Sequence, residues 1–133
     1  VRRQRQMCIR DRSYTNAVLE SGVKIILEET KLESFIKNAD FVITGEGRLD
    51  GQTVMGKAPI GVAEIAKKYE KKVLAFGGCV AEDATLCNQY GIDAFFPILR
   101  TVTTLKEAMD FNHAKENLSA AVEQVFRLIQ SFE

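Results

Sequence analysis

The sequence predicts an α/β fold in which helices cover both faces of a parallel sheet, a three-layer and Rossmann-like arrangement. Two observations carry this prediction. Strand-like apolar runs alternate with helix-like segments along the chain, which is typical of βαβ units. The strand-like runs are also apolar throughout, as expected for strands buried on both faces. Because the sequence supplies only three strands, we expect the chain to be part of a larger fold.

Each predicted element of the first half has a local reason. The residues before the first strand place apolar side chains at helical spacing. The run DFVIT is short, β-branched and aromatic, which favours a buried strand. Pro59 suits the first turn of a helix, because a backbone N–H has no partner there in any case. The predicted elements are a helix over 14–38 with interruptions at Gly22 and near Thr30, a strand over 40–44, a loop over 45–58 and a helix over 59–70.

The second half continues the alternation. The run KVLAFGG predicts a second buried strand, and Gly91 ends the helix that follows it. Either Thr103 or Thr104 can cap a short helix, and the last stretch places apolar side chains such as Leu118 and Val125 on one helical face. The predicted elements are a strand over 72–78, a helix over 82–90, a strand over 92–99, a short helix ending at Met109 and a helix over 112–132.

The charge distribution separates a short basic prefix from the rest of the 133 residues. Residues 1–12 hold five Arg and one Asp, although the whole chain has 18 basic and 18 acidic side chains. We expect this prefix to be non-native or a disordered basic arm, and it lacks the apolar segment of a signal peptide. Residues 13–133 are therefore mildly acidic, which argues against nucleic-acid binding. They form the predicted domain.

Composition excludes several further classes of protein. No apolar run approaches the roughly 20 residues that cross a bilayer, so we expect no membrane association. Three Cys without a CxxC pair predict a reducing compartment, the cytoplasm, rather than a disulfide framework. His113 is the only His, so neither a zinc site nor a His-dependent hydrolase is favoured.

The segment 45–58 is the candidate functional loop, because a routine βα connection has only about 2–6 residues. Its glycines let the chain approach a ligand closely, and the helix predicted at Pro59 adds a partial positive charge. These are the components of a phosphate or carboxylate site. The candidate residues are the charged side chains Glu46, Arg48, Asp50 and Lys57, the polar side chains Gln52 and Thr53, and the glycines Gly45, Gly47 and Gly56.

Two known phosphate-binding patterns match this loop incompletely. The sequence GEGRLD at 45–50 has Asp50 where a dinucleotide fingerprint has its third glycine, and GQTVMGK at 51–57 is followed by Ala58 instead of Ser or Thr. The loop could also be a solvated connection, in which an ion pair between Glu46 and Lys57 contributes little.

Longer stretches resemble the bacterial glycerate kinases of the glycerate 2-kinase type. The similarity covers residues 14–133, in the part that corresponds to the C-terminal portion of these larger two-domain enzymes. It implies transfer of the γ-phosphate of ATP to D-glycerate, usually at the 2-hydroxyl, with Mg²⁺, and a missing N-terminal portion of the same enzyme as partner. The similar stretches are ADFVITGEGRLDGQTVMGKAPIGVAEIAKKY at 39–69, VLAFGG at 73–78, YGIDAFFPIL at 90–99 and NLSAAVEQVFRLI at 117–129.

With this resemblance, the candidate residues acquire expected roles. Arg48 and Lys57 are the cations expected to face phosphate or the glycerate carboxylate. Asp50 and Glu46 either hold Mg²⁺ or accept the proton of the substrate hydroxyl. Gly45, Gly47 and Gly56 offer close backbone approach, Gln52 and Thr53 orient the substrate, and Gly77 and Gly78 border the nucleotide.

Two other functions remain open at this stage. The chain could be a non-catalytic Rossmann-like module that binds a nucleotide or a small anion. It could also be a partner-dependent domain, in which exposed apolar faces pair with a separately encoded half.

Overall fold

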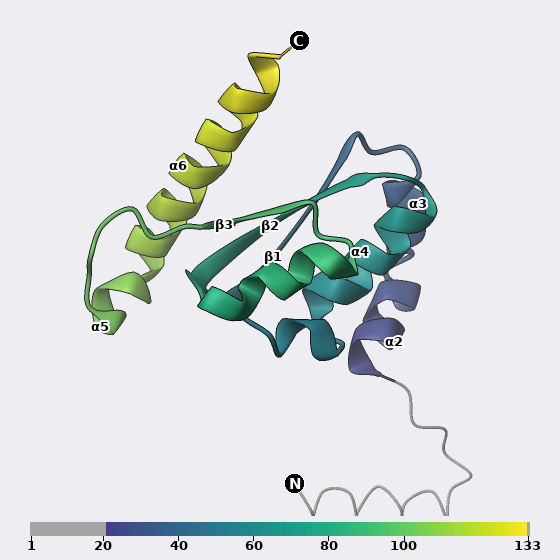
Figure 1. The fold of residues 1–133 in the computed structure, drawn as a ribbon, viewed down its shortest axis with the longest axis horizontal. Helices are drawn as coiled ribbons and strands as arrows, with labels where there is room; N and C mark the ends of the chain where they lie inside the picture. The colour runs from purple at the N-terminus through teal and green to yellow at the C-terminus, as the bar shows by residue number, and fades with distance from the viewer. Residues whose placement is uncertain (1–20, 133) are drawn as a thin grey trace, which may run out of the picture.

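A computed structural model describes residues 21–132, so the basic prefix 1–12 and the start of the predicted first helix lie outside the described residues (Figure 1). The helices are α2 (Gly22–Glu29), α3 (Leu32–Ile36), α4 (Ala58–Lys68), α5 (Leu105–Ala108) and α6 (Phe111–Gln130), with 3₁₀ segments η1 (Thr53–Met55) and η2 (Glu82–Tyr90). The strands are β1 (Phe41–Leu49), β2 (Lys72–Val80) and β3 (Ala94–Pro97).

The predicted parallel α/β sheet is confirmed. Its strand order is β1-β2-β3, and both pairs are parallel. Helix α4 connects β1 to β2 and η2 connects β2 to β3, and residues of both connections pack in one core cluster. Right-handed crossovers in a sheet that advances in one direction place successive connections on the same face.

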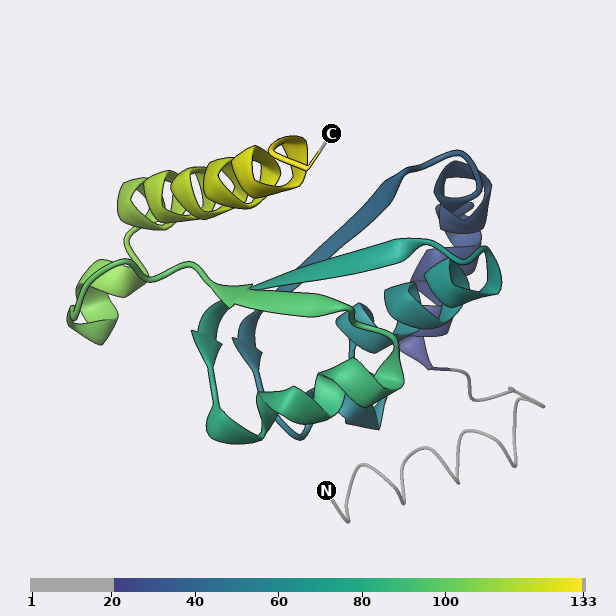
Figure 2. The ribbon, with the colours of Figure 1, turned by 45° about the horizontal axis from the view of Figure 1, so that its top comes forward.

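Strand β2 divides the core into two clusters on opposite faces of the sheet. Val73 and Ala75 pack toward α4 and η2, whereas Leu74 and Phe76 pack toward Val125 of α6. Successive side chains of a strand point to opposite faces, so a strand buried on both faces must be apolar throughout. Figure 2 shows α6 above the sheet and α4 and η2 below it, which gives helix, sheet and helix layers.

Strand β1 is longer than predicted and includes the first five residues of the predicted loop. Residues 45–49 continue the pairing with β2 as far as Leu49 opposite Val80. The glycines do not end the strand, because glycines of β2 lie beside them and the two backbones approach closely. A Cβ atom on Gly78 would lie 2.7 Å from the carbonyl oxygen of Gly47.

The interruption predicted near Thr30 is confirmed, because α2 and α3 are separated at Lys31, whose φ is 52°. Other boundaries differ from the predictions for local reasons. The helix predicted over 82–90 is a 3₁₀ segment, and β3 ends at Pro97, which has no N–H to donate. The predicted cap at Thr104 is confirmed, because its hydroxyl accepts from the N–H of Glu107.

Asp93 joins three elements at the end of the sheet opposite the candidate loop. Its Oδ2 atom accepts from the backbone N–H of Val73 at 2.7 Å and from the ammonium group of Lys67. The Nζ atom of Lys72 lies 3.9 Å from Oδ1. Burial alone would raise the pKa of the Asp93 carboxyl, but these hydrogen bonds and charges outweigh it, and the pKa lies below its usual value.

We expect Asp93→Asn to lower the free energy of unfolding by about 1.5–3 kcal/mol, the range for hydrogen bonds to charged groups. Because the folded-state pKa is lowered, this stabilisation is present above the unfolded pKa and is lost as the pH falls through the folded pKa. The difference between the two proteins in urea unfolding should therefore shrink below about pH 4. Asp40→Asn, at an exposed carboxylate, is the control, and an equal loss in both variants would contradict the role of Asp93.

Candidate functional site

The four charged residues singled out in the sequence converge between the end of β1 and the start of α4. The Nζ atom of Lys57 lies 3.8 Å from Oε1 of Glu46 and 3.9 Å from Oδ1 of Asp50. The Nε atom of Arg48 lies 3.1 Å from Oδ2 of Asp50. Lys57 is the N-cap residue of α4, where the helix dipole adds a partial positive charge. Two cations and two carboxylates therefore form one connected cluster.

Asp50 is the centre of this cluster, and both of its carboxylate oxygens are engaged. Oδ1 accepts from the backbone N–H of Gln52 at 3.0 Å, while Oδ2 accepts from Arg48. Burial alone would raise the pKa of the Asp50 carboxyl. The Gln52 hydrogen bond and the charges of Lys57 and Arg48 outweigh it, so the pKa lies below its usual value. Asp50 is thus held as an anion that organises its neighbours.

Thr53 lies inside the loop. Its side chain is fully buried, and its hydroxyl accepts from the backbone N–H of Asp50 at 3.1 Å. This hydrogen bond closes the turn between β1 and η1. The adjacent Gln52 is exposed and contributes its backbone N–H to Asp50. Thr53 therefore stabilises the loop from inside. The Gln52 side chain lies at the surface.

The three glycines of the predicted loop occupy different environments. Gly45 lies against β2, because a Cβ atom there would be 2.7 Å from the carbonyl oxygen of Phe76. Gly47 has open space at its Cβ position. Gly56 has a φ of 93°, the left-handed region that glycine adopts without steric cost, and it lies directly before the N-cap Lys57. Only Gly47 combines open space with a position on β1.

A cavity of about 1010 Å³ lies between the carboxyl ends of the strands and helices α5 and α6. Gly78 lines it, whereas Gly77 does not and is packed against Leu49. Glu46 also lines it, so the cavity reaches the charged cluster. Its wall is mainly apolar and includes Ile43, Phe76, Ile98, Leu105, Met109, Leu118 and Val122.

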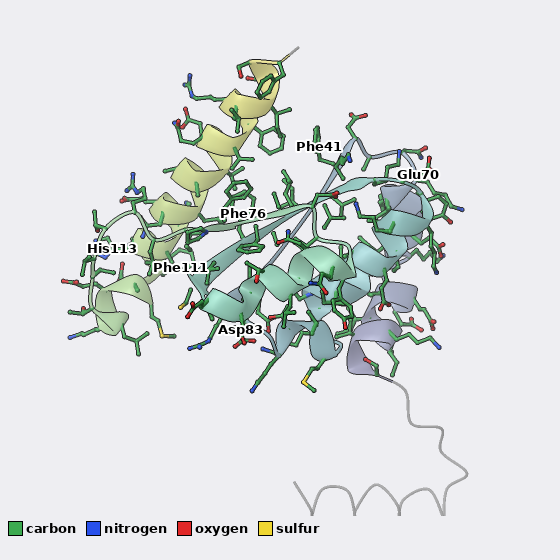
Figure 3. All side chains as sticks on the ribbon, in the orientation of Figure 1. Phe41, Glu70, Phe76, Asp83, Phe111 and His113 are labelled. Atoms are coloured by element: carbon green, nitrogen blue, oxygen red, sulfur yellow. The ribbon has the colours of Figure 1, made fainter. Side chains whose placement is uncertain are left out.

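Two residues near the site were not predicted. Cys79 is exposed and lines the cavity. Asp83 covers the loop, because a Cβ atom on Gly51 would lie 2.5 Å from its Oδ2 atom. Figure 3 shows Asp83 on η2, on the opposite side of the sheet from α6. No local pattern indicates either position, since both depend on contacts between distant segments.

The cluster offers little to a divalent cation besides one carboxylate oxygen. Residues 21–132 contain no group of three or more His, Cys, Asp or Glu side chains arranged to hold a metal ion. Asp50 has both oxygens engaged, but Oε2 of Glu46 is buried and has no hydrogen-bond partner. Mg²⁺ in kinases is commonly held by one or two carboxylates together with phosphate oxygens and water. One unsatisfied carboxylate oxygen, next to the cation Lys57 and the N-terminus of α4, is compatible with that mode.

No helix in the described part of the chain is both long enough and apolar enough to cross a membrane.

Comparisons with known proteins agree with the resemblance. The sequence model described as the glycerate kinase family matches residues 12–130. The chain is 41% identical to a glycerate kinase of Haemophilus influenzae over 111 residues, which are 84% of this chain and 29% of that protein. It is 43% identical to the glycerate 2-kinase of Escherichia coli over 109 residues, which are 82% of this chain and 28% of that protein.

A solved structure is similar as well. A crystal structure from Salmonella typhimurium LT2, of a protein provisionally named glycerate kinase 2, matches with a TM-score of 0.63 and 35% identity. The match covers 91% of this chain and 31% of that one. This chain therefore spans less than a third of the length of these relatives.

Proposed function

The chain belongs to the glycerate kinase family, and from this premise we propose that it forms part of an enzyme that transfers the γ-phosphate of ATP to D-glycerate, at the 2-hydroxyl. The observation that supports this most is the convergence of Arg48 and Lys57 at the carboxyl end of β1. Phosphoryl transfer depends mainly on positioning and on neutralising charge. A pair of cations beside a helix N-terminus provides both.

The two cations suit different parts of the reactants. Lys57 caps α4, so its ammonium group and the helix dipole act on the same point, and we assign it to the transferred phosphoryl group. The Arg48 side chain is 64% exposed although Nε is held by Asp50. Its remaining N–H groups can therefore pair with a carboxylate, and we assign them to glycerate.

The two carboxylates are also assigned separate roles. Asp50 has its oxygens engaged and a lowered pKa, which makes it a weak proton acceptor. We assign it to positioning Arg48 and Lys57. Glu46 has the unpartnered oxygen, and we assign it to Mg²⁺. The metal would supply charge neutralisation at the phosphates.

The nucleotide is assigned to the cavity beside α5 and α6. Its apolar wall suits the base, and Gly47 and Gly78 lie where the phosphates would pass toward Glu46. Gly77 does not line the cavity, and we assign it to packing β2 against Leu49 of β1.

A chimera tests the proposed reaction, with this chain replacing the region of the E. coli glycerate 2-kinase that it matches. We expect ATP-dependent consumption of D-glycerate, and ³¹P NMR should show 2-phosphoglycerate as product. A folded chimera that binds ATP or glycerate without turnover would contradict the proposal and favour a non-catalytic binding module.

We expect Asp50→Asn to lower kcat/KM of this chimera about 100-fold, because a small misplacement of reacting groups has an effect of that size. Because its pKa is lowered, Asp50 stays ionised at every pH above the ordinary carboxyl pKa. The contribution of the Asp50 charge to kcat/KM of the unsubstituted chimera should therefore be lost only as the pH falls below about 4. Steady-state rates between pH 5 and 9 check this, with Asp40→Asn as control. An acid limb that lies above pH 5 and disappears in Asp50→Asn would assign proton transfer to Asp50 instead.

A further inference from the structure

Thr53 is the one buried polar residue among residues 21–132, and none of its surface is exposed. Threonine is usually found near the surface of proteins, because its hydroxyl loses hydrogen bonds to water when it is buried. A buried hydroxyl therefore needs a partner within the protein. For Thr53 this partner is Asp50, the residue at the centre of the charged cluster.

Three hydrogen bonds join Thr53 to Asp50. The Thr53 hydroxyl accepts from the backbone N–H of Asp50 at 3.1 Å and donates to its Oδ1 atom at 3.5 Å. The backbone N–H of Thr53 donates to the carbonyl oxygen of Asp50 at 2.9 Å. One residue therefore contacts both backbone polar groups and one carboxylate oxygen of Asp50.

Thr53 is also connected to Lys57. Its carbonyl oxygen accepts from the backbone N–H of Gly56 and, at 3.3 Å, from that of Lys57. Lys57 is the N-cap residue of α4, and its Nζ atom lies 3.9 Å from Oδ1 of Asp50. Thr53 thus lies between two charged residues of the cluster, and a shift of Thr53 would displace both.

The inner side of this turn is occupied by η2. Cys87 is fully buried, and its thiol donates to the carbonyl oxygen of Asp50 at 4.0 Å. Burial and the nearby carboxylates raise the pKa of this thiol, so it stays protonated and remains a donor at neutral pH. The N–H of Ala81, the N-cap residue of η2, donates to the carbonyl oxygen of Leu49 at 2.9 Å. Asp50 therefore cannot settle inward when its contact with Thr53 is lost.

We propose that Thr53 is a positioning residue for the phosphoryl transfer, and that its hydroxyl acts through Asp50 and not on the substrates. The hydroxyl fixes the backbone and the carboxylate of Asp50, which in turn orients Arg48 and Lys57. This inference rests on the proposed function, because it assigns Thr53 to the same reaction. A misplacement of reacting groups by about 1 Å can lower a rate about 100-fold, so loss of this buried contact is sufficient to affect turnover.

Two substitutions in the chimera with the E. coli enzyme separate the hydroxyl of Thr53 from its methyl group. Thr53→Val keeps the shape of the side chain but leaves the Asp50 N–H without its partner, so we expect kcat/KM to fall about 10–100-fold. Thr53→Ser keeps the hydroxyl, and we expect kcat/KM within about threefold of the unsubstituted chimera, although loss of the buried methyl group lowers the thermal midpoint.

A role in stability alone predicts that the rates of the two variants follow their thermal midpoints. Thr30→Val is the control, because it removes a hydroxyl that donates to the carbonyl oxygen of Ile26, in a helix outside the site. Equal values of kcat/KM in Thr53→Val and Thr53→Ser would overturn the proposal.

A double-mutant cycle shows whether the hydroxyl acts through Asp50. If it does, Thr53→Val causes little further loss of kcat/KM in a chimera that already carries Asp50→Asn, and the two effects are not additive. A double variant whose loss is the product of the two single losses would overturn the proposal and assign the hydroxyl to the substrates.

Hydrogen exchange provides a readout that needs no turnover. The N–H groups of Asp50 and Gln52 bond to the Thr53 hydroxyl and to Oδ1 of Asp50, so we expect them to exchange at least about tenfold faster in Thr53→Val than in Thr53→Ser. Equal exchange in the two variants would overturn the proposal, whether or not the chimera phosphorylates glycerate. The expected difference in a chimera without turnover would contradict the proposed function and leave the link between Thr53 and Asp50 in place.

Discussion

Replacement of Lys57 by alanine is expected to lower kcat of the chimera by about 10²–10³-fold, the loss typical of removing one group that stabilises developing charge. Lys57 is the residue that contacts both carboxylates of the cluster, and it stands at the first turn of α4. Its ammonium group and the helix terminus thus act together on a phosphoryl group. No other described cation lies within 4.0 Å of both Glu46 and Asp50.

The stability of the protein should respond much less to this substitution. The Lys57 side chain is 36% exposed, its ion pairs are 3.8 and 3.9 Å long, and it makes no side-chain capping hydrogen bond. Such pairs contribute about 0–1 kcal/mol. Lys71→Ala, outside the cluster, is the control, and thermal unfolding of each variant separates loss of folding from loss of turnover. Turnover near that of the unsubstituted chimera in Lys57→Ala would remove Lys57 from the site.

The parts of the fold that were predictable depend on local patterns. The apolar run of β2 and the amphipathic pattern of α6 identify elements whose burial follows from residue type alone. The Thr104 cap is equally local, since a hydroxyl and a Glu three residues later are sufficient. In each case the physical cause lies within a few residues of the element.

The extension of β1 could not be predicted in that way. Residues 45–49 are rich in glycine and charge, which disfavours a strand when they are considered alone. They pair because Gly77 and Gly78 lie opposite on β2 and permit close approach. The cause therefore lies about 30 residues away in sequence.

The candidate site shows the same division. Residue types alone pointed to Glu46, Arg48, Asp50 and Lys57, and the structure brings these four together. The distribution of roles could not be derived from spacing, because it depends on which carboxylate oxygens are engaged and which is not. Asp83 was missed because its contact with Gly51 comes from a separate element.

Gly45 and Gly47 offer a decisive comparison, since both were predicted to approach a ligand and both line the cavity, but only Gly47 has space for a Cβ atom. We expect Gly45→Ala to lower the free energy of unfolding by about 1–3 kcal/mol, the usual effect of overpacking. The added Cβ would lie 2.7 Å from the carbonyl oxygen of Phe76, a backbone atom that cannot move without separating β1 from β2. Neither glycine has a positive φ, so steric space and not backbone strain decides the result.

Gly47→Ala should behave in the opposite way in the same chimera. Nothing lies within 4 Å of its Cβ position, so we expect a change in stability within about 0.5 kcal/mol. Because Gly47 lines the cavity beside Glu46, the methyl group should instead weaken nucleotide binding, which calorimetric titration with ATP would measure. Unchanged ATP affinity in Gly47→Ala would contradict the role assigned to Gly47, and unchanged stability in Gly45→Ala would contradict the role assigned to Gly45. A strand glycine is thus required either by the neighbouring strand or by the ligand, and these two substitutions distinguish the cases.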